Sequence, residues 1–176
     1  MADLYRLDLP PHTQLIDGSL VFPCPQQVFH SVGGCLVERG LRDGLPDHLR
    51  VRRQMCVVID DRNVPEPDVI VVRAGSVRGP GQTLYDAANV LLAVEVVSPE
   101  SESRDRDTKP HKYAAAGIAH YWRVERADAK DRRLVVYVYE LDPASRVYAL
   151  TGIHRGQLKV EVPYPISVDL TEIDHL

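Results

Sequence analysis

Apolar side chains recur along the first hundred residues with two different periods. Over residues 26–41 they follow helical spacing, which predicts a helix that Gly33 and Gly34 either weaken or pack closely against a neighbour. Other stretches are rich in Val and Ile and are flanked by Pro, Gly or Ser, as strands commonly are. These predicted strands cover residues 49–60, 68–73 and 90–97.

The second half of the chain shows the same change of period. The segment SRDRDTKPHKYAAAG (103–117) predicts a helix that ends at Gly117, with Pro110 in its first turn or at a kink. Residues 120–126 and 132–142 return to strand patterns, as do shorter segments near both ends of the chain. Helix, strands, helix and strands in this order predict an α/β (α+β) fold with a central mixed β-sheet flanked by helices. The 176 residues fit a single domain over 1–176.

Composition narrows the class of protein. No apolar run reaches the roughly 18 residues of a membrane helix, and the three cysteines form no ligand cluster, so we expect a cytoplasmic protein without a membrane partner. The net charge of −4 argues against non-specific coating of nucleic acid. Between residues 104 and 133, however, nine basic residues stand against five acidic ones. That surplus indicates either a basic face for a phosphate-bearing partner or an ordinary solvated surface.

One carboxylate interrupts the aliphatic run 90–97. Glu95 lies there between apolar residues, and an unpaired carboxylate is costly to bury, so it needs a partner. If strands 68–73 and 90–97 pair antiparallel, Asp68 comes to lie beside Glu95. Two such carboxylates require a cation, and oxygen ligands suit Mg²⁺ or Mn²⁺, to which the Val96 backbone carbonyl could add a ligand. Alternatively, Asp68 caps a turn and Glu95 pairs with an arginine.

Three polar side chains share one face of the predicted second helix. Asp105, Lys109 and Tyr113 are spaced four residues apart, a spacing that in most helices gives a surface ion pair. This helix follows directly from the strand that carries Glu95. Lys109 is therefore expected to lean over the metal position, where it could orient a water or stabilise charge on a phosphate.

Four motifs resemble a known family. In chain order they are LIDGSLV, PEPDVIVV (65–72), AVEVVSP (93–99) and RDRDTKPHKYAAAGIAHYWRVE (104–125). Together they look like Uma-two, a family of proposed restriction endonucleases that belongs to the PD-(D/E)XK nuclease superfamily. The resemblance runs from about residue 14 to the C-terminus. It implies a restriction-endonuclease-like core in which acidic residues hold a divalent metal ion.

The resemblance assigns roles to three residues. Asp68 matches the acid of the PD element, and Glu95 matches the acid of the (D/E)XK element. The lysine expected two residues after that acid is absent, because position 97 is valine. Lys109 on the following helix matches the lysine of this family, with Lys112 as the alternative.

A second departure lies near the N-terminus. The family usually has a glutamate before its Leu-Ile-Asp-Gly motif, and this chain has Gln14. We therefore expect weaker metal affinity if that acid matters. Asp17 is the nearest substitute, although an Asp before Gly is first of all a turn residue. His30 matches a histidine at the start of the family's first long helix, where it either faces the site or packs the helix.

These residues predict a metal-dependent endonuclease that hydrolyses phosphodiester bonds in DNA. Asp68 and Glu95 would hold Mg²⁺ or Mn²⁺, and Lys109 would position the attacking water. A homodimer with one site for each DNA strand would suit double-strand cleavage. The alternative is a catalytically degenerate module that keeps the fold and binds nucleic acid or protein. The target sequence and the choice between DNA and RNA are not encoded in any motif that we recognise.

Overall fold

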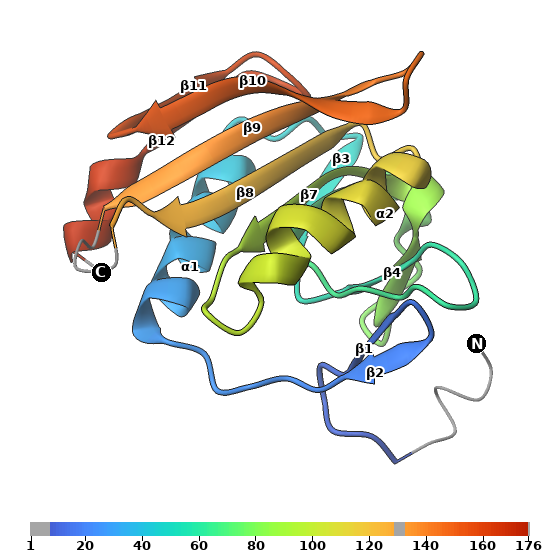
Figure 1. Cartoon of the computed structure of the whole chain (residues 1–176). Helices are drawn as coiled ribbons and strands as arrows, with labels where there is room; N and C mark the ends of the chain where they lie inside the picture. The colour runs from blue at the N-terminus through green and yellow to red at the C-terminus, as the bar shows by residue number, and fades with distance from the viewer. Residues whose placement is uncertain (1–7, 129–132, 176) are drawn as a thin grey trace.

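Six strands form a mixed sheet at the centre of the molecule (Figure 1). The computed structural model describes residues 8–128 and 133–175, so the start of the predicted strand 132–142 and residues 130–132 of the basic segment lie outside it. Within the sheet, β7 and β8 run parallel and the other neighbours are antiparallel. The predicted mixed sheet is thereby confirmed. In spatial order the strands are β10 (Val147–Arg155), β9 (Leu134–Asp142), β8 (His120–Arg126), β7 (Val90–Val96), β5 (Val69–Arg73) and β3 (Leu49–Arg53).

The first helix, α1 (Val28–Arg42), packs on one face of this sheet. Its glycines allow the close packing that was one of the two interpretations of the sequence. A Cβ built on Gly33 would lie 3.3 Å from Leu134 Cδ2 and 3.7 Å from Val96 Cγ1. The start of α1 is therefore held against the end of β7, which brings His30 to the edge of the sheet where that strand ends.

The opposite face is covered by α2 (Lys109–Ala115), which follows a π-helical turn over Arg104–Thr108. Pro110 lies in the first turn of α2, directly after the π-helical turn, and Gly117 ends the helix with a φ of +81°. Tyr113 is fully buried against this face. α2 lies in the connection between the parallel strands β7 and β8, and it follows the strand that carries Glu95 through a short loop and the π-helical turn.

The antiparallel pairing of β5 and β7, expected from sequence, is confirmed. Val69 pairs with Val94, and the same register continued by one residue places Asp68 opposite Glu95. The two acids thus come from neighbouring strands at one edge of the sheet.

Smaller elements complete the fold. The predicted strand over 49–60 is wrong as one element, because Gln54 takes a positive φ of 50° and its N–H bonds to the carbonyl of Asp68. β3 therefore ends before β4 (Cys56–Val58), and β4 pairs in parallel with a short strand, β6 (Leu84–Asp86). No helix of the described residues is long and apolar enough to cross a membrane. The short strands are β1 (Gln14–Ile16), β2 (Ser19–Val21), β4 (Cys56–Val58), β6 (Leu84–Asp86), β11 (Gln157–Val160) and β12 (Ile166–Asp169).

The contact of α1 with β12 gives a test of the packing. A Cβ on Gly40 would lie 2.2 Å from Val168 Cγ2, so we expect Gly40→Ala to lower the free energy of unfolding by at least about 1 kcal/mol, despite the better helix propensity of alanine. Gly75→Ala is the control, because its Cβ would meet nothing within 4 Å. Urea unfolding measures both variants, and equal stabilities would contradict this packing.

Candidate active site

Glu95 has direct partners on α2. Its carboxylate is almost fully buried, with the residue 2% exposed. Oε2 accepts a hydrogen bond from Lys109 Nζ at 2.9 Å, and Oε1 accepts one from the Tyr113 hydroxyl at 2.6 Å. The partner that the aliphatic run required is therefore the family lysine, and the arginine considered as an alternative does not fill this role.

A second carboxylate, that of Asp105, reaches the same lysine. Asp105 Oδ1 lies 3.0 Å from Lys109 Nζ, and both side chains are buried. The four-residue spacing of Asp105, Lys109 and Tyr113 put them on one helix face, and the structure places all three in one buried cluster with Glu95. We call these four residues the Glu95 cluster.

The electrostatics of the Glu95 cluster follow from its composition. One lysine stands between two buried carboxylates, so negative charge is in excess. Burial raises the pKa of Glu95 to about 8, and the Lys109 ammonium opposes that rise. Burial alone would lower the pKa of Lys109, but the carboxylates of Glu95 and Asp105 raise it above its ordinary value. Lys109 is therefore an ammonium whose charge holds Glu95, and it is unsuited to act as a free base.

Asp68 lies at the adjoining edge of the sheet and is more accessible than Glu95. Its Oδ2 accepts the Val96 backbone N–H at 2.7 Å, and His30 Nε2 lies 3.2 Å from Oδ1. The side chain is 18% exposed. The observed contact with Val96 is thus through its N–H, whereas the sequence suggested a role for its carbonyl. This hydrogen bond fixes Asp68 against the residue that follows Glu95.

Asp68 lines a hollow of about 160 Å³ that lies between the β1–β2 hairpin and the start of α1. Gln14 and His30 line the hollow, as does Glu66, which sequence reasoning missed. The Glu66 side chain is 9% exposed and meets His12 Nδ1 at 2.6 Å. Its backbone N–H bonds to the Gln14 side-chain oxygen at 3.1 Å. The signal was present in PEPD, because alternate residues of an extended segment point to the same side.

The family is settled by comparison with known proteins. A family model described as "Putative restriction endonuclease", Uma2 (Uma-two), matches residues 1–171. The chain belongs to the Uma2 family. It is also similar to the crystal structure of a "putative nuclease belonging to DUF820" from Anabaena variabilis ATCC 29413. That match has a TM-score of 0.69 and 13% identity, and it covers 92% of this chain and 88% of the other.

These comparisons support a nuclease. At 13% identity the structural likeness shows the fold, and it agrees with the nuclease-like core expected from the motifs. A search of curated proteins gave no match. The Uma2 family therefore gives the general class of activity. Which residues would carry that activity has to be argued from the side chains of this chain.

Two alternative candidates lie outside the hollow of this Uma2 protein. Lys112 and Asp17 form an ion pair with each other, and neither lines the hollow. Asp17 has a positive φ of 53°, as its position before Gly18 suggested. Lys109, rather than Lys112, contacts the acid of β7.

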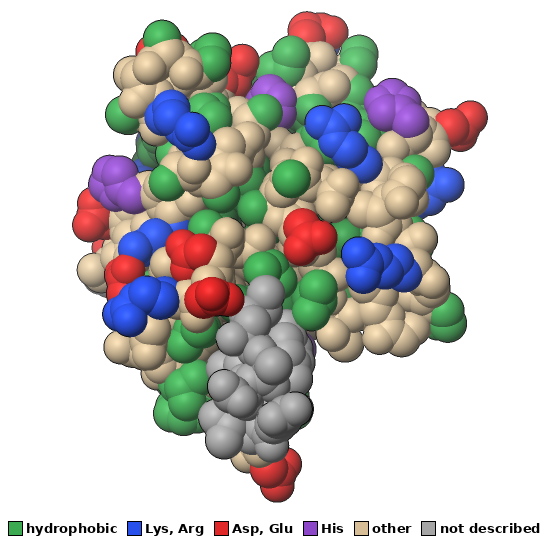
Figure 2. All heavy atoms as spheres, turned by 90° about the vertical axis from the view of Figure 1, so that its right-hand side faces the viewer, with side chains coloured by type: hydrophobic (Ala, Val, Ile, Leu, Met, Phe, Trp, Pro, Cys, Tyr) green, Lys and Arg blue, Asp and Glu red, His purple; other side chains and the backbone are tan. Residues whose placement is uncertain are grey.

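The basic surplus over 104–133 is largely neutralised within the structure. Lys109 is buried with Glu95, Arg106 pairs with Glu102 and Glu125, and Arg123 also pairs with Glu125. On the face shown in Figure 2, acidic and basic side chains are interspersed. The segment therefore does not act as one strong basic stripe along its described length.

The two strand acids fit a magnesium-type ion better than a zinc-type site. Among residues 8–128 and 133–175, no group of three or more His, Cys, Asp and Glu side chains gathers as metal ligands. Mg²⁺ is nevertheless commonly held by one or two carboxylates together with waters and substrate phosphates. A carboxylate has about four lone-pair sites, so Asp68 and Glu95 keep acceptor capacity beyond their observed contacts. The donor set thus suits a hard divalent cation.

The buried ion pair gives a stability test with a matched control. Lys109→Met leaves two buried carboxylates without a cation, and we expect it to lower the free energy of unfolding by about 3–5 kcal/mol. Lys112→Met removes a more exposed lysine from the same helix and should cost less than about 1 kcal/mol. Adding Glu95→Gln to Lys109→Met should recover part of the loss. Equal urea midpoints for the two lysine variants would contradict the buried pair.

Proposed function

We propose that this Uma2 protein is a divalent-metal-dependent endonuclease that hydrolyses phosphodiester bonds in DNA. The observation that carries the proposal is the Glu95 cluster, which lies behind Asp68 at the end of β7. A buried ion pair with a purely structural role can be replaced as a whole by apolar side chains at little cost, whereas here the pair is kept together with a tyrosine and a second acid. The family description supports the general class of activity.

Asp68 and Glu95 are the residues that would hold the ion, Mg²⁺ or Mn²⁺. When bound, such an ion neutralises charge on the phosphate oxygens and lowers the pKa of a bound water. Asp68 faces the hollow and is oriented by Val96 and His30, so its carboxylate is positioned before any substrate arrives. Glu95 is oriented from behind by Lys109 and Tyr113.

Lys109 contributes its charge and its remaining N–H groups. An ammonium has three N–H donors; one is used in the hydrogen bond to Glu95, and a second faces Asp105 Oδ1 at 3.0 Å. Because the neighbouring acids raise the pKa of Lys109, it stays protonated and donates to a water or a phosphate oxygen. From α2, Lys109 can take the role of the superfamily's lysine, which is expected two residues after the acid, where this chain has Val97.

Glu66 gives the hollow a carboxylate in place of the one that is absent at Gln14. Gln14 uses its side-chain oxygen to hold the backbone of Glu66, and the Glu66 carboxylate lies in the same hollow as Asp68. We therefore assign to Glu66 the charge compensation that the glutamate at position 14 gives in other members. A homodimer in the cytoplasm, with one site for each strand, completes the proposal.

A degenerate binding module is the second candidate function. The neutral Gln14 favours it, because one acid of the family pattern is missing. The intact Glu95 cluster favours the enzyme. Cleavage separates the two candidates directly.

The cleavage test uses a matched pair of aspartates. With plasmid DNA and Mg²⁺ or Mn²⁺, we expect wild-type protein to nick the DNA and Asp68→Asn to be slower by about 10²–10³-fold, since one of the two carboxylates that would hold the charge-neutralising ion is lost. Asp17→Asn changes an exposed aspartate outside the hollow and should cleave like wild type. Equal nicking by all three proteins, or none by any, would overturn the assignment.

Metal affinity tests the role of position 14 without relying on activity. Restoring the family acid with Gln14→Glu should tighten Mn²⁺ binding, because it adds negative charge to a hollow that already holds Asp68 and Glu66. Asp68→Asn should weaken it. Isothermal titration calorimetry measures both affinities, and Mn²⁺ binding that neither substitution changes would place the ion elsewhere.

A further inference from the structure

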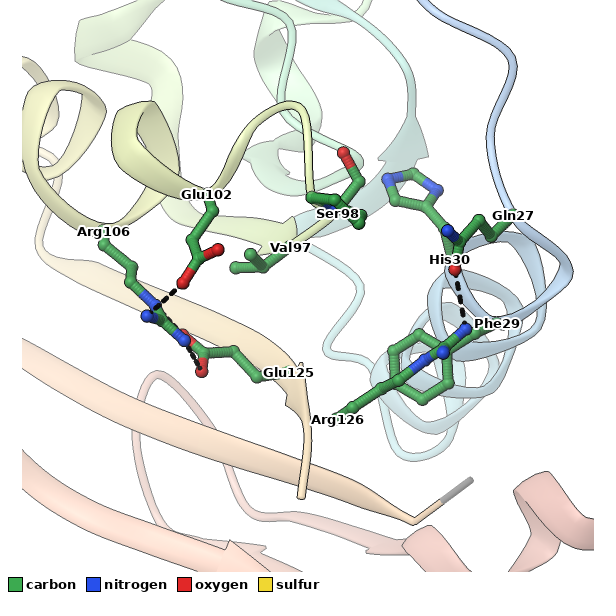
Figure 3. A pocket seen from close by; sticks show the side chains of 10 residues that line it. Gln27, Phe29, His30, Val97, Ser98, Glu102, Arg106, Glu125 and Arg126 are labelled. Atoms are coloured by element: carbon green, nitrogen blue, oxygen red, sulfur yellow. Dashed lines mark hydrogen bonds and ion pairs between the residues drawn. The ribbon is translucent and has the colours of Figure 1, made fainter. Parts of the chain in front are cut away.

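A second and larger groove continues from the hollow that contains Asp68. Its volume is about 410 Å³, and it shares His30 and Ser98 with the hollow. The groove lies between the start of α1 and the end of β8, with Val97 and Ser98 between them (Figure 3). The groove therefore continues the hollow on one side, and a chain-like substrate bound at Asp68 would extend into it.

One wall of the groove is charged but internally neutralised. Arg106 donates two hydrogen bonds to Glu125, at 2.9 and 2.7 Å, and also pairs with Glu102. Figure 3 shows these three side chains gathered on the α2 side of the groove. Since two carboxylates neutralise the Arg106 guanidinium, this wall of the groove is polar but carries little positive charge for a ligand.

The opposite wall carries a cation on an aromatic ring. The guanidinium carbon of Arg126 lies 4.5 Å from the centre of the Phe29 ring. Its Nη2 donates to the Gln27 side-chain oxygen at 2.9 Å, so within the described part of the chain this guanidinium contacts a neutral amide and a ring. Arg126 and Phe29 are each partly exposed (Figure 3). An arginine held in this way keeps N–H donors for an anion and a planar group on which another ring can stack.

The size and chemistry of the groove indicate its ligand. Pockets of ~300–1,000 Å³ hold small organic molecules, and this groove is near the lower end of that range, on the scale of one nucleotide. A guanidinium that can meet a phosphate and also offer its planar face to a base is one of the means by which proteins bind single strands. The link through His30 and Ser98 places that nucleotide next to the phosphate at Asp68.

We propose that the groove binds one unpaired nucleotide adjacent to the scissile phosphate, with Arg126 as its anchor and Phe29 as the support of Arg126. This proposal rests on the proposed nuclease function. It assigns the substrate as DNA that is single-stranded on one side of the cleavage position, such as a duplex with an extension.

Binding without divalent metal tests the groove. In buffer with EDTA, fluorescence anisotropy compares a blunt DNA duplex with the same duplex carrying a single-stranded extension. Because stacking of one base contributes a measurable part of affinity, we expect wild-type protein to bind the extended duplex at least about 5-fold more tightly. Arg126→Ala and Phe29→Leu should remove this preference. Arg126→Lys, which keeps the charge without the planar group, should lose most of it.

The control is Arg73→Ala, at the end of β5 remote from Asp68, which should keep the preference. Circular dichroism melts check folding, and if Arg126→Ala is unfolded the decision passes to Arg126→Lys and Phe29→Leu. Equal binding of both probes by wild type, or an unchanged preference in the folded Arg126 and Phe29 variants, would overturn the groove proposal.

Plasmid cleavage by the same proteins separates this proposal from the nuclease function. Cleavage by wild type with an unchanged probe preference in the Arg126 variants overturns the groove and leaves the nuclease. No cleavage by wild type, with a probe preference that the Arg126 variants lose, overturns the nuclease and supports a nucleotide-binding groove.

Discussion

The contact between Lys109 and Glu95 is the interaction on which the rest of the site depends. It joins the end of a central strand to the first turn of the helix that follows, and both side chains are almost fully buried. Two charges in such a place are tolerated only when each has a partner in good geometry. Asp105 and Tyr113 supply the remaining contacts, so the position of α2 over the sheet and the orientation of Glu95 are fixed together.

The two strand acids differ in accessibility: Glu95 is buried, whereas Asp68 is partly exposed. Glu95 is oriented from one face of the sheet by α2, whereas Asp68 is oriented from the edge by Val96 and by His30 of α1. The close approach of α1 at Gly33 is what brings His30 to that edge. The two helices therefore act on neighbouring acids from opposite faces. The hollow and the adjoining groove lie between the start of α1 and the segment 97–106 that leads into α2.

Much of this site could be predicted from sequence because it depends on local periods. Strand pairing put Asp68 beside Glu95, and four-residue spacing put Lys109 and Tyr113 on one helix face. The contact of Arg126 with Phe29 could not be predicted, since it depends on how α1 packs against β8. Glu66 was missed because its place in the hollow involves a hydrogen bond from its backbone to the Gln14 side chain, 52 positions away in the sequence. The break at Gln54 was missed because a positive φ has no strong signal at glutamine.

The central claim is that this cluster is a metal-binding nuclease centre and more than a buried ion pair. A crystal structure of the protein grown with Mn²⁺ tests it most directly, because the anomalous scattering of manganese locates the ion independently of the protein atoms. We expect a manganese peak that Asp68 and Glu95 share, with Lys109 still in contact with Glu95. A structure without a peak at these acids, or with manganese bound only elsewhere, would contradict it.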